Sequence, residues 1–192
     1  MREIVKLGLI LFIITLVAAT LLAFANEATS ELIAQVQEQE NNKARQEVLP
    51  SAEKFEPLDE SELNAIVTEN NRVKEVYIGK DSADKLVGYT IKATSSGYGG
   101  DIEIITGISA DGQVTGMKVV SHSETPGLGA NSTKPEFQNQ FVGKSTATNI
   151  SVVKSAPQNS EIQAISGATI TSKAVTNGVN IAIDVFNGKL AK

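Results

Sequence analysis

The feature that most constrains the fold is an uncharged apolar run near the N-terminus. Leu7 to Ala25 extends for 19 residues without a charged side chain, close to the ~20 residues that a helix needs to cross a bilayer. Arg2 and Lys6 precede the run, whereas Glu27 and Glu31 follow it. Because basic flanks stay on the cytoplasmic side, this asymmetry predicts a cytoplasmic N-terminus and an extracytoplasmic remainder. We expect residues 1–26 to form a single transmembrane anchor.

A cleavable signal peptide is the competing interpretation of the same residues. Ala23-Phe24-Ala25 fits a small-x-small cleavage site. The apolar run is longer than the ~7–15-residue core of an ordinary signal peptide, which favours a retained anchor. A mature N-terminus near Asn26 would show that the segment is removed.

Residues 27–60 carry mostly polar side chains and read as a helical stalk or linker. Leu32, Ile33 and Val36 are its sparse apolar residues, and Pro50 is expected to end the helix. An apolar stripe this narrow can bury little surface by itself. The segment is therefore either a solvated stalk or packed on a neighbouring subunit.

Residues 61–192 are long enough for one domain of roughly 130 residues with its own core. Four segments rich in Val, Ile and Tyr form two hairpin patterns, which predicts an antiparallel sheet. These strand segments are Val73–Gly79, Leu86–Ala93, Asp101–Ile108 and Val114–Val120. A further short strand is expected at Ile150–Val153.

Helical patterns flank these strands, so the predicted fold class is α+β. Ser61–Asn70 has Ser61 as its expected N-cap, and Lys134–Phe141 carries two phenylalanines four residues apart. Lys173–Phe186 has apolar residues at helical spacing and is the expected terminal helix.

Composition excludes several kinds of chemistry. The sequence has no cysteine and only one histidine, His122, so the chain supplies no ligands for an iron–sulfur cluster, a bis-histidine haem or a His-cluster metal site. The formal net charge of −5 argues against a nucleic-acid partner. We predict no metal site and no catalytic residues, and if the protein moves electrons an organic cofactor must carry them.

Ser166 to Ser172 reads Ser-Gly-Ala-Thr-Ile-Thr-Ser and lies just ahead of the terminal helix. The first turn of a helix has unpaired N–H groups and the positive end of the helix dipole, which together attract phosphate. Gly167 and Ala168 keep bulk away from a docked group. A phosphorylated ligand is one interpretation, and an ordinary helix capped by a hydroxyl is the other.

Two motifs in this order resemble a known family. The Ser166–Ser172 run and Ser121–Gly129, which contains Glu-Thr-Pro-Gly-Leu-Gly, are similar to the signatures of the FMN-binding domain in the G subunit of the Rnf electron-transport complex. The C subunit of the sodium-translocating NADH:quinone oxidoreductase is a related family. The resemblance implies FMN joined to Thr169 by a phosphoester bond. It also implies cofactor contacts from the rest of the motif: Ser166, Gly167, Ala168, Ile170 and Thr171.

The second motif is expected to contact the flavin ring. Pro126-Gly127 suits the centre of a type II turn, and a flavin site needs an apolar wall, close backbone and a few polar groups. We therefore expect flavin contacts from Glu124, Thr125, Leu128 and Gly129. His122 is interpreted as an ordinary strand-end residue.

A third loop, Ser95–Gly100, contains three glycines around Tyr98. It is either a tightly turned connection or backbone that approaches the flavin ring with Tyr98 packing nearby. The sequence leaves both interpretations open.

The function implied by the resemblance is that of an electron carrier that is not catalytic alone. The Rnf complex exchanges electrons between ferredoxin and NAD, coupled to sodium ions or protons, so the implied partners are its other subunits. A separate flavin transferase would attach the FMN, since no His or Lys constellation in the sequence activates Thr169. The alternatives are a C-type subunit of the quinone reductase, a membrane-tethered ligand-binding module and a free-standing extracytoplasmic FMN reductase.

Overall fold

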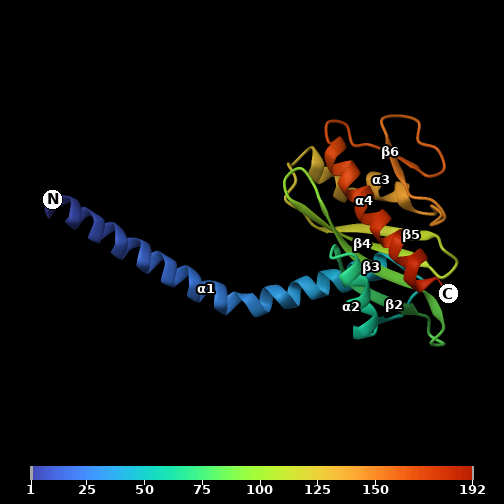
Figure 1. The fold of residues 1–192 in the computed structure, drawn as a ribbon, viewed down its shortest axis with the longest axis horizontal. Helices are drawn as coiled ribbons and strands as arrows, with labels where there is room; N and C mark the ends of the chain where they lie inside the picture. Colours follow the sequence, from blue (N-terminus) through green and yellow to red (C-terminus); the bar gives the residue numbers. More distant parts are fainter. Residues whose placement is uncertain (1, 192) are drawn as a thin grey trace. The chain divides into compact units, whose positions relative to one another are not determined.

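The computed structural model describes residues 2–191. They divide into two compact units, residues 2–40 and residues 41–191. Helix α1 (Arg2–Val48) begins in the first unit and ends in the second (Figure 1). The second unit combines a five-stranded sheet with helices, so the α+β prediction is confirmed.

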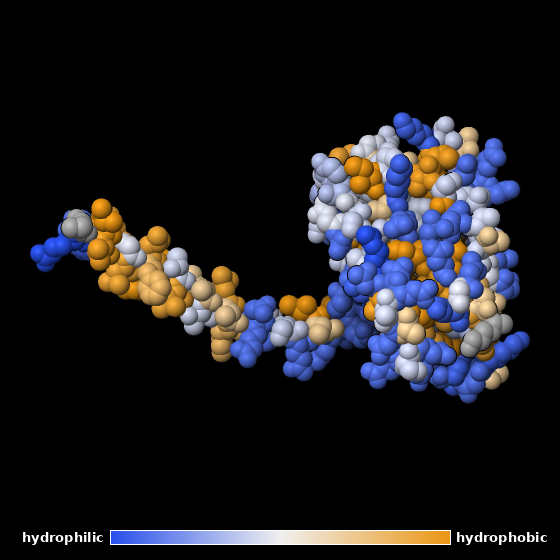
Figure 2. Space-filling view, in the orientation of Figure 1, coloured by the Kyte–Doolittle hydropathy of each residue, from blue (hydrophilic) through white to orange (hydrophobic). Residues whose placement is uncertain are grey.

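The first unit is the helical segment that the apolar run predicts. Its most apolar window of 18 residues has a mean hydropathy of 2.8, long and apolar enough to cross a membrane. Leu, Ile, Val and Phe side chains here are exposed and give the helix its orange surface in Figure 2. A membrane anchor and an N-terminal signal sequence both meet this criterion of length and composition.

The sheet in the second unit is antiparallel throughout, with the strand order β1-β2-β3-β4-β5. Its strands are β1 (Lys54–Pro57), β2 (Val73–Lys80), β3 (Leu86–Ser96), β4 (Asp101–Ser109) and β5 (Val114–Ser121). Both predicted hairpins are present. Strand β1 was not predicted, because its four residues are mostly exposed and include two charged side chains and a proline.

One face of the sheet is covered by α4 (Thr169–Val185), which runs across it in Figure 1. Val175, Val179 and Ile183 of α4 are fully buried in one cluster with Ile91 and Ile104 of the sheet. This cluster is the main core of the domain. Helix α2 (Glu60–Glu69) adds Ile66 to it, and α4 leads into a single π-helical turn, η3 (Phe186–Leu190).

The other face of the sheet receives the last turns of α1. Ala44 and Val48 pack on Ile105, which follows Ile104 on β4 and therefore points to the opposite face. Gly107 and Gly116 lack side chains that would collide with the Val48 backbone, and the Val48 carbonyl accepts a hydrogen bond from Thr115. The compact unit thus begins at Asn41, within the segment 27–60 that we expected to be a linker.

Buried charges hold this end of α1 in place. The Arg45 guanidinium is 1% exposed, pairs with Glu75 and stacks 3.8 Å from the centre of the Tyr77 ring. Lys92, also buried, lies 3.5 Å from the same glutamate and 3.0 Å from Glu103. Because an unpaired buried charge is costly, this network specifies how the helix end sits on the sheet.

Three local predictions about helix ends were wrong. Helix α2 is capped by Asp59 instead of Ser61, and the pKa of Asp59 is lowered by hydrogen bonds from the Ser61 hydroxyl and N–H. The predicted helix Lys134–Phe141 is broken into shorter pieces. Helix α4 begins at Thr169, four residues earlier than the apolar pattern indicated. The pieces of the broken segment, with the turn before it, are η1 (Gly129–Thr133), α3 (Pro135–Gln138) and η2 (Asn139–Phe141).

The remaining elements close the domain. Phe137 and Phe141 form the expected aromatic anchor, edge to face with ring centres 5.6 Å apart. Strand β6 (Ser151–Val153) is present as predicted, and it pairs in parallel with β7 (Glu161–Gln163), which was not predicted.

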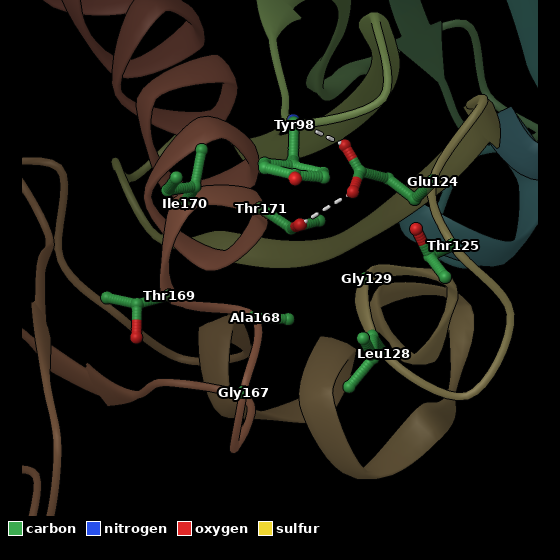
Figure 3. A pocket seen from close by; sticks show the side chains of 10 residues that line it. All are labelled: Tyr98, Glu124, Thr125, Leu128, Gly129, Gly167, Ala168, Thr169, Ile170 and Thr171. Carbon is green, nitrogen blue, oxygen red and sulfur yellow. Dashed lines mark hydrogen bonds between the residues drawn. The ribbon is translucent and has the colours of Figure 1, made fainter.

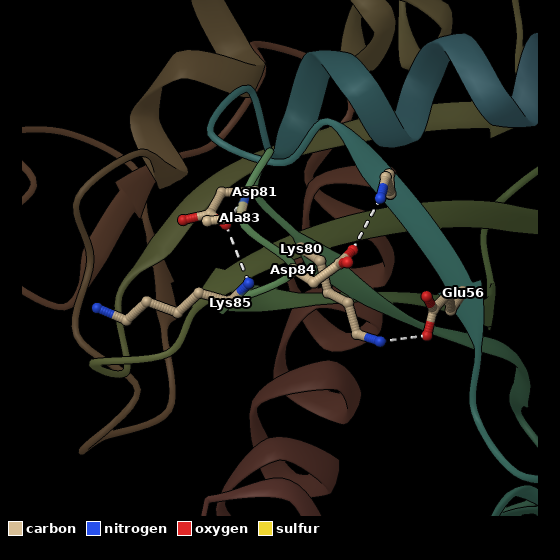
Figure 4. A network of polar contacts seen from close by, with 7 residues as sticks. Glu56, Lys80, Asp81, Ala83, Asp84 and Lys85 are labelled. Atoms are coloured by element: carbon tan, nitrogen blue, oxygen red, sulfur yellow. Dashed lines mark hydrogen bonds and ion pairs between the residues drawn. The ribbon is translucent and has the colours of Figure 1, made fainter.

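A network of polar contacts lies at the edge of the sheet, near β1 and the β2–β3 turn (Figure 4). Lys54 bonds Asp84 at 2.8 Å, Lys80 pairs with Glu56, and Asp81 accepts N–H bonds inside the turn. Exposed pairs of this kind contribute little to stability. We assign no chemical role to them.

Candidate functional site

A cavity of about 450 Å³ lies where three segments of the second unit meet (Figure 3). The segments are the glycine-rich loop around Tyr98, the loop 124–129 and the start of α4. Its volume falls within the range of small-molecule sites, ~300–1,000 Å³. The lining residues are Tyr98, Glu124, Thr125, Leu128, Gly129, Gly167, Ala168, Thr169, Ile170 and Thr171.

The fold therefore brings both sequence motifs to one cavity, although more than 30 residues separate them in the chain. Every predicted cofactor residue except Ser166 lies in the lining. Ser166 is exposed and precedes Gly167, whose φ of +76° turns the chain into the helix. Tyr98, which sequence reasoning left open, also lies on the cavity.

The N-terminus of α4 has no side-chain cap, so of the two interpretations that the sequence left open, the helix capped by a hydroxyl is not observed. Its N-cap residue is Ala168, and no side chain bonds the first turn. Within residues 2–191, the N–H groups of Thr169, Ile170 and Thr171 have no acceptor. This end of a 17-residue helix therefore presents free donors and a positive dipole to an anion.

The nearby hydroxyls have different surroundings. Thr171 is buried and donates to Glu124 Oε2 at 2.7 Å. Ser172 is also buried, donates to the Ala168 carbonyl and accepts the Ile165 N–H, both at 2.9 Å. Thr169 is half-buried, and its hydroxyl has no hydrogen-bond partner among the described residues. Of these three residues, Thr169 is the one that lines the cavity and has a hydroxyl without a partner among the described residues.

Glu124 is buried beside the cavity, and its carboxylate oxygens face the protein. Oε1 accepts the N–H groups of Tyr98 and Gly99 at 2.7 and 3.1 Å, and Oε2 accepts the Thr171 hydroxyl. Burial alone would raise the pKa of Glu124. The hydrogen bonds from Thr171, Gly99 and Tyr98, with a smaller contribution from His122, outweigh burial and lower that pKa.

His122 has a local structural role in this loop. Its Nδ1 accepts the Glu124 N–H at 3.1 Å, which fixes the start of the loop 124–129. His122 directly follows β5 and is not among the residues that line the cavity, in keeping with an ordinary strand-end histidine.

The lowered pKa of Glu124 predicts a pH dependence of stability. Because the folded state favours the ionised form, this residue's contribution is complete above its ordinary pKa of 4.5 and is lost as the pH falls through the lower folded value. Glu124→Gln should therefore lose less thermal stability than the wild type as the pH falls below 4.5. Asp59 and Asp84 also have lowered pKa values, so the difference between the two melting curves is the measure. Parallel curves would contradict the assignment.

Gly129 has a steric requirement in this site. A Cβ on Gly129 would overlap Glu124 Oε2 and lie 2.6 Å from the Thr171 hydroxyl oxygen. Gly127 is different, since its φ of +78° needs glycine while no atom stands nearby; this agrees with glycine at the second central position of the predicted type II turn.

Gly129→Ala is accordingly expected to destabilise the domain by about 1–3 kcal/mol, the usual cost of overpacking a well-filled site. Chemical denaturation monitored by circular dichroism measures the change. Gly188→Ala is the matched control, because nothing lies within 4 Å of a Cβ there. Equal stability of the two variants would refute the steric argument.

Large apolar side chains stand at the rim of the cavity. Tyr98, Leu128 and Ile170 are 72%, 46% and 57% exposed, far more than a typical core residue. Gly129, which has no side chain, also lines the cavity. Together these residues offer surfaces on which a flat ring can pack. The residues present thus fit FMN: free donors and a free hydroxyl for the phosphate end, and apolar walls for the ring.

Comparisons with known proteins identify the family of the domain that contains this cavity. Residues 97–184 match the FMN-binding domain family, a range that contains the whole cavity lining. The chain also resembles solved structures of the C subunit of the sodium-translocating NADH-quinone reductase. The protein from Shewanella oneidensis has a TM-score of 0.58 at 19% identity, with 78% of this chain and 93% of that chain covered. The Parabacteroides distasonis protein has a TM-score of 0.57 at 22% identity, with 81% of this chain and 96% of that chain covered. At such identities the likeness concerns the fold.

Relatives with higher identity extend over nearly the whole chain. The G subunit of the Na⁺-translocating ferredoxin:NAD⁺ oxidoreductase complex of Acetobacterium woodii is 47% identical over 96% of this chain and 92% of the relative. The G subunit of the ion-translocating oxidoreductase complex of Methanosarcina acetivorans is 40% identical over 98% and 97%. The Clostridium ljungdahlii relative, the G subunit of a proton-translocating complex, is 38% identical over 88% and 83%. The chain therefore belongs to the family of G subunits of ion-translocating oxidoreductase complexes, and it contains that family's FMN-binding domain.

Proposed function

We propose that this chain is an electron-carrier subunit that holds FMN through a phosphoester bond to Thr169. The observation that carries the proposal is the Thr169 hydroxyl, which has no partner among residues 2–191 and stands at an uncapped helix N-terminus on the cavity. The relatives' names supply the setting, an ion-translocating ferredoxin:NAD⁺ oxidoreductase. The other subunits of that complex are the proposed partners.

Each part of the cavity has a role in this proposal. The N–H groups of Thr169, Ile170 and Thr171 would hold the phosphate oxygens. Leu128, Ile170 and Tyr98 would flank the ring and limit its contact with water. FMN, when bound, supplies the chemistry of accepting and passing on one or two electrons.

The attachment itself requires a partner enzyme. A threonine hydroxyl is a weak nucleophile, and no base bonds Thr169 in the described part of the chain. We propose a flavin transferase that uses FAD: the Thr169 oxygen bonds to the FMN phosphorus, the pyrophosphate bond breaks and AMP leaves. The hydroxyl proton passes to a base of the transferase. The chain is then a substrate of that enzyme and not itself a catalyst.

The apolar part of α1 and the family together indicate a membrane protein. We propose a single retained anchor with a cytoplasmic N-terminus, because Arg2 and Lys6 flank the run on that side. The FMN domain would then be extracytoplasmic. A covalent tether suits this location, since it prevents loss of the cofactor to the surrounding medium.

Flavin fluorescence on a denaturing gel tests the proposal. The chain purified from its native host should fluoresce after boiling in detergent, since only a covalent bond survives that treatment. A colourless chain from a host with an active transferase would instead favour the tethered ligand-binding module.

A further inference from the structure

Glu124 connects two segments that form opposite sides of the cavity. One carboxylate oxygen accepts the N–H groups of Tyr98 and Gly99, and the other accepts the Thr171 hydroxyl. The residue is only 6% exposed. Figure 3 shows this carboxylate between the Tyr98 loop and the first turn of α4, with a hydrogen bond to each.

Two glycines make room for this carboxylate. A Cβ on Gly97 would overlap Glu124 Oε1, and one on Gly129 would overlap Glu124 Oε2. Neither glycine has a left-handed φ, so the requirement is for space and not for an unusual backbone. Two of the glycines that suggested a close approach to a ligand therefore accommodate an internal acid.

The connection acts on the first turn of α4. Thr171 and Thr169 lie on the same helical turn, so a bond that fixes Thr171 also fixes the direction in which Thr169 and the free N–H groups are presented. The bonds to Tyr98 and Gly99 fix the opposite wall relative to that turn. Charge-assisted hydrogen bonds are strong enough for this purpose.

We propose that Glu124 is a positioning residue for flavin attachment, which holds the glycine-rich loop and the first turn of α4 at the separation that the cofactor needs. This inference rests on the proposed function, because the separation matters only if Thr169 is the attachment point. Glu124 acts through Thr171 and the two backbone N–H groups. The lowered pKa of Glu124 agrees with an ionised acceptor at neutral pH.

Thr171 offers a test that separates positioning from packing. Thr171→Ser keeps the hydroxyl and loses a methyl group, whereas Thr171→Val keeps the shape and loses the hydroxyl. Positioning predicts that transferase attaches FMN to the Ser variant within about twofold of the wild-type rate and to the Val variant about tenfold more slowly. Packing alone predicts the reverse order, and that order would overturn the proposal.

Glu124 itself provides the second measurement, on the full-length chain before FMN is attached. Glu124→Ala should raise the hydrogen-exchange rates of the Tyr98 and Gly99 amides about tenfold. Glu124→Gln should rescue both exchange protection and attachment, because its amide can accept from the N–H groups and donate to Thr171. Asp101→Asn is the control, because it removes a different carboxylate from the same loop, the one that accepts a hydrogen bond from the Ser96 hydroxyl. It should change neither the amide exchange rates nor FMN attachment.

The outcomes distinguish this inference from the proposed function. Wild-type attachment and exchange rates in Glu124→Ala would overturn the positioning role while leaving FMN on Thr169 intact. An unmodified wild-type chain in the presence of transferase would overturn the proposed function, and the positioning role with it. If Glu124→Ala does not fold, the relative attachment rates of Thr171→Ser and Thr171→Val test the positioning role instead.

Discussion

Replacing Thr169 with alanine is expected to abolish covalent FMN and to leave the fold intact. The hydroxyl would be the only oxygen joined to the cofactor, so its removal leaves no atom for the phosphoester bond. The same hydroxyl makes no hydrogen bond among the described residues and is half-buried, so its loss should cost less than ~1 kcal/mol of unfolding free energy. Flavin fluorescence on a denaturing gel and a thermal melt measure the two effects.

Ser166→Ala is the matched control, because that hydroxyl belongs to the same motif but lies outside the cavity lining. It should keep covalent FMN. Thr169→Ser should also be modified, since it retains a hydroxyl at the same place. Covalent flavin in Thr169→Ala would show that another residue is the attachment point, whereas its absence from Ser166→Ala would implicate the motif more broadly.

Removing residues 1–60 is expected to prevent the domain from folding, whereas removing residues 1–40 is not. The longer deletion takes away β1 and the buried side chains of Val48, Leu49 and Leu58. Burial of each such side chain is worth ~1.5–3 kcal/mol, and the loss of Arg45 removes a partner of Glu75. The sum is comparable with the ~5–15 kcal/mol that stabilises a typical domain.

Circular dichroism and the cooperativity of thermal unfolding compare the two fragments. A fragment of residues 53–192 is the informative intermediate, since it keeps β1 and lacks the end of α1 that packs on Ile105. It should be destabilised strongly relative to 41–192. If the 61–192 fragment unfolds as cooperatively as 41–192, the end of α1 is not part of the domain core.

The central elements of the fold could be predicted from the sequence because they follow simple patterns. The two hairpins carry β-branched residues on either side of short polar turns, and Gly112, between β4 and β5, has a positive φ of 79° that glycine accepts readily. Strand β1 could not be found this way, since Phe55 is its only large apolar residue. The burial of Arg45 was equally hidden, because a charged side chain in a polar helix gives no sign of its partners.

In the site, too, some features follow from local sequence patterns and others do not. Local motifs identified both loops and placed Thr169 near a helix N-terminus, because the small and hydroxyl residues are adjacent in the sequence. The bond between Glu124 and Thr171 joins residues 47 positions apart, and no local pattern encodes it. The early start of α4 was missed because the apolar repeat begins only at Val175, whereas the helix begins at Thr169.

The measurement that tests the central claim most directly is intact mass with peptide mapping, on the chain purified from its native host. The proposed function predicts an added mass equal to one FMN less one water, located on Thr169. An unmodified chain from a host that possesses the transferase, or a modification on a different residue, would contradict it.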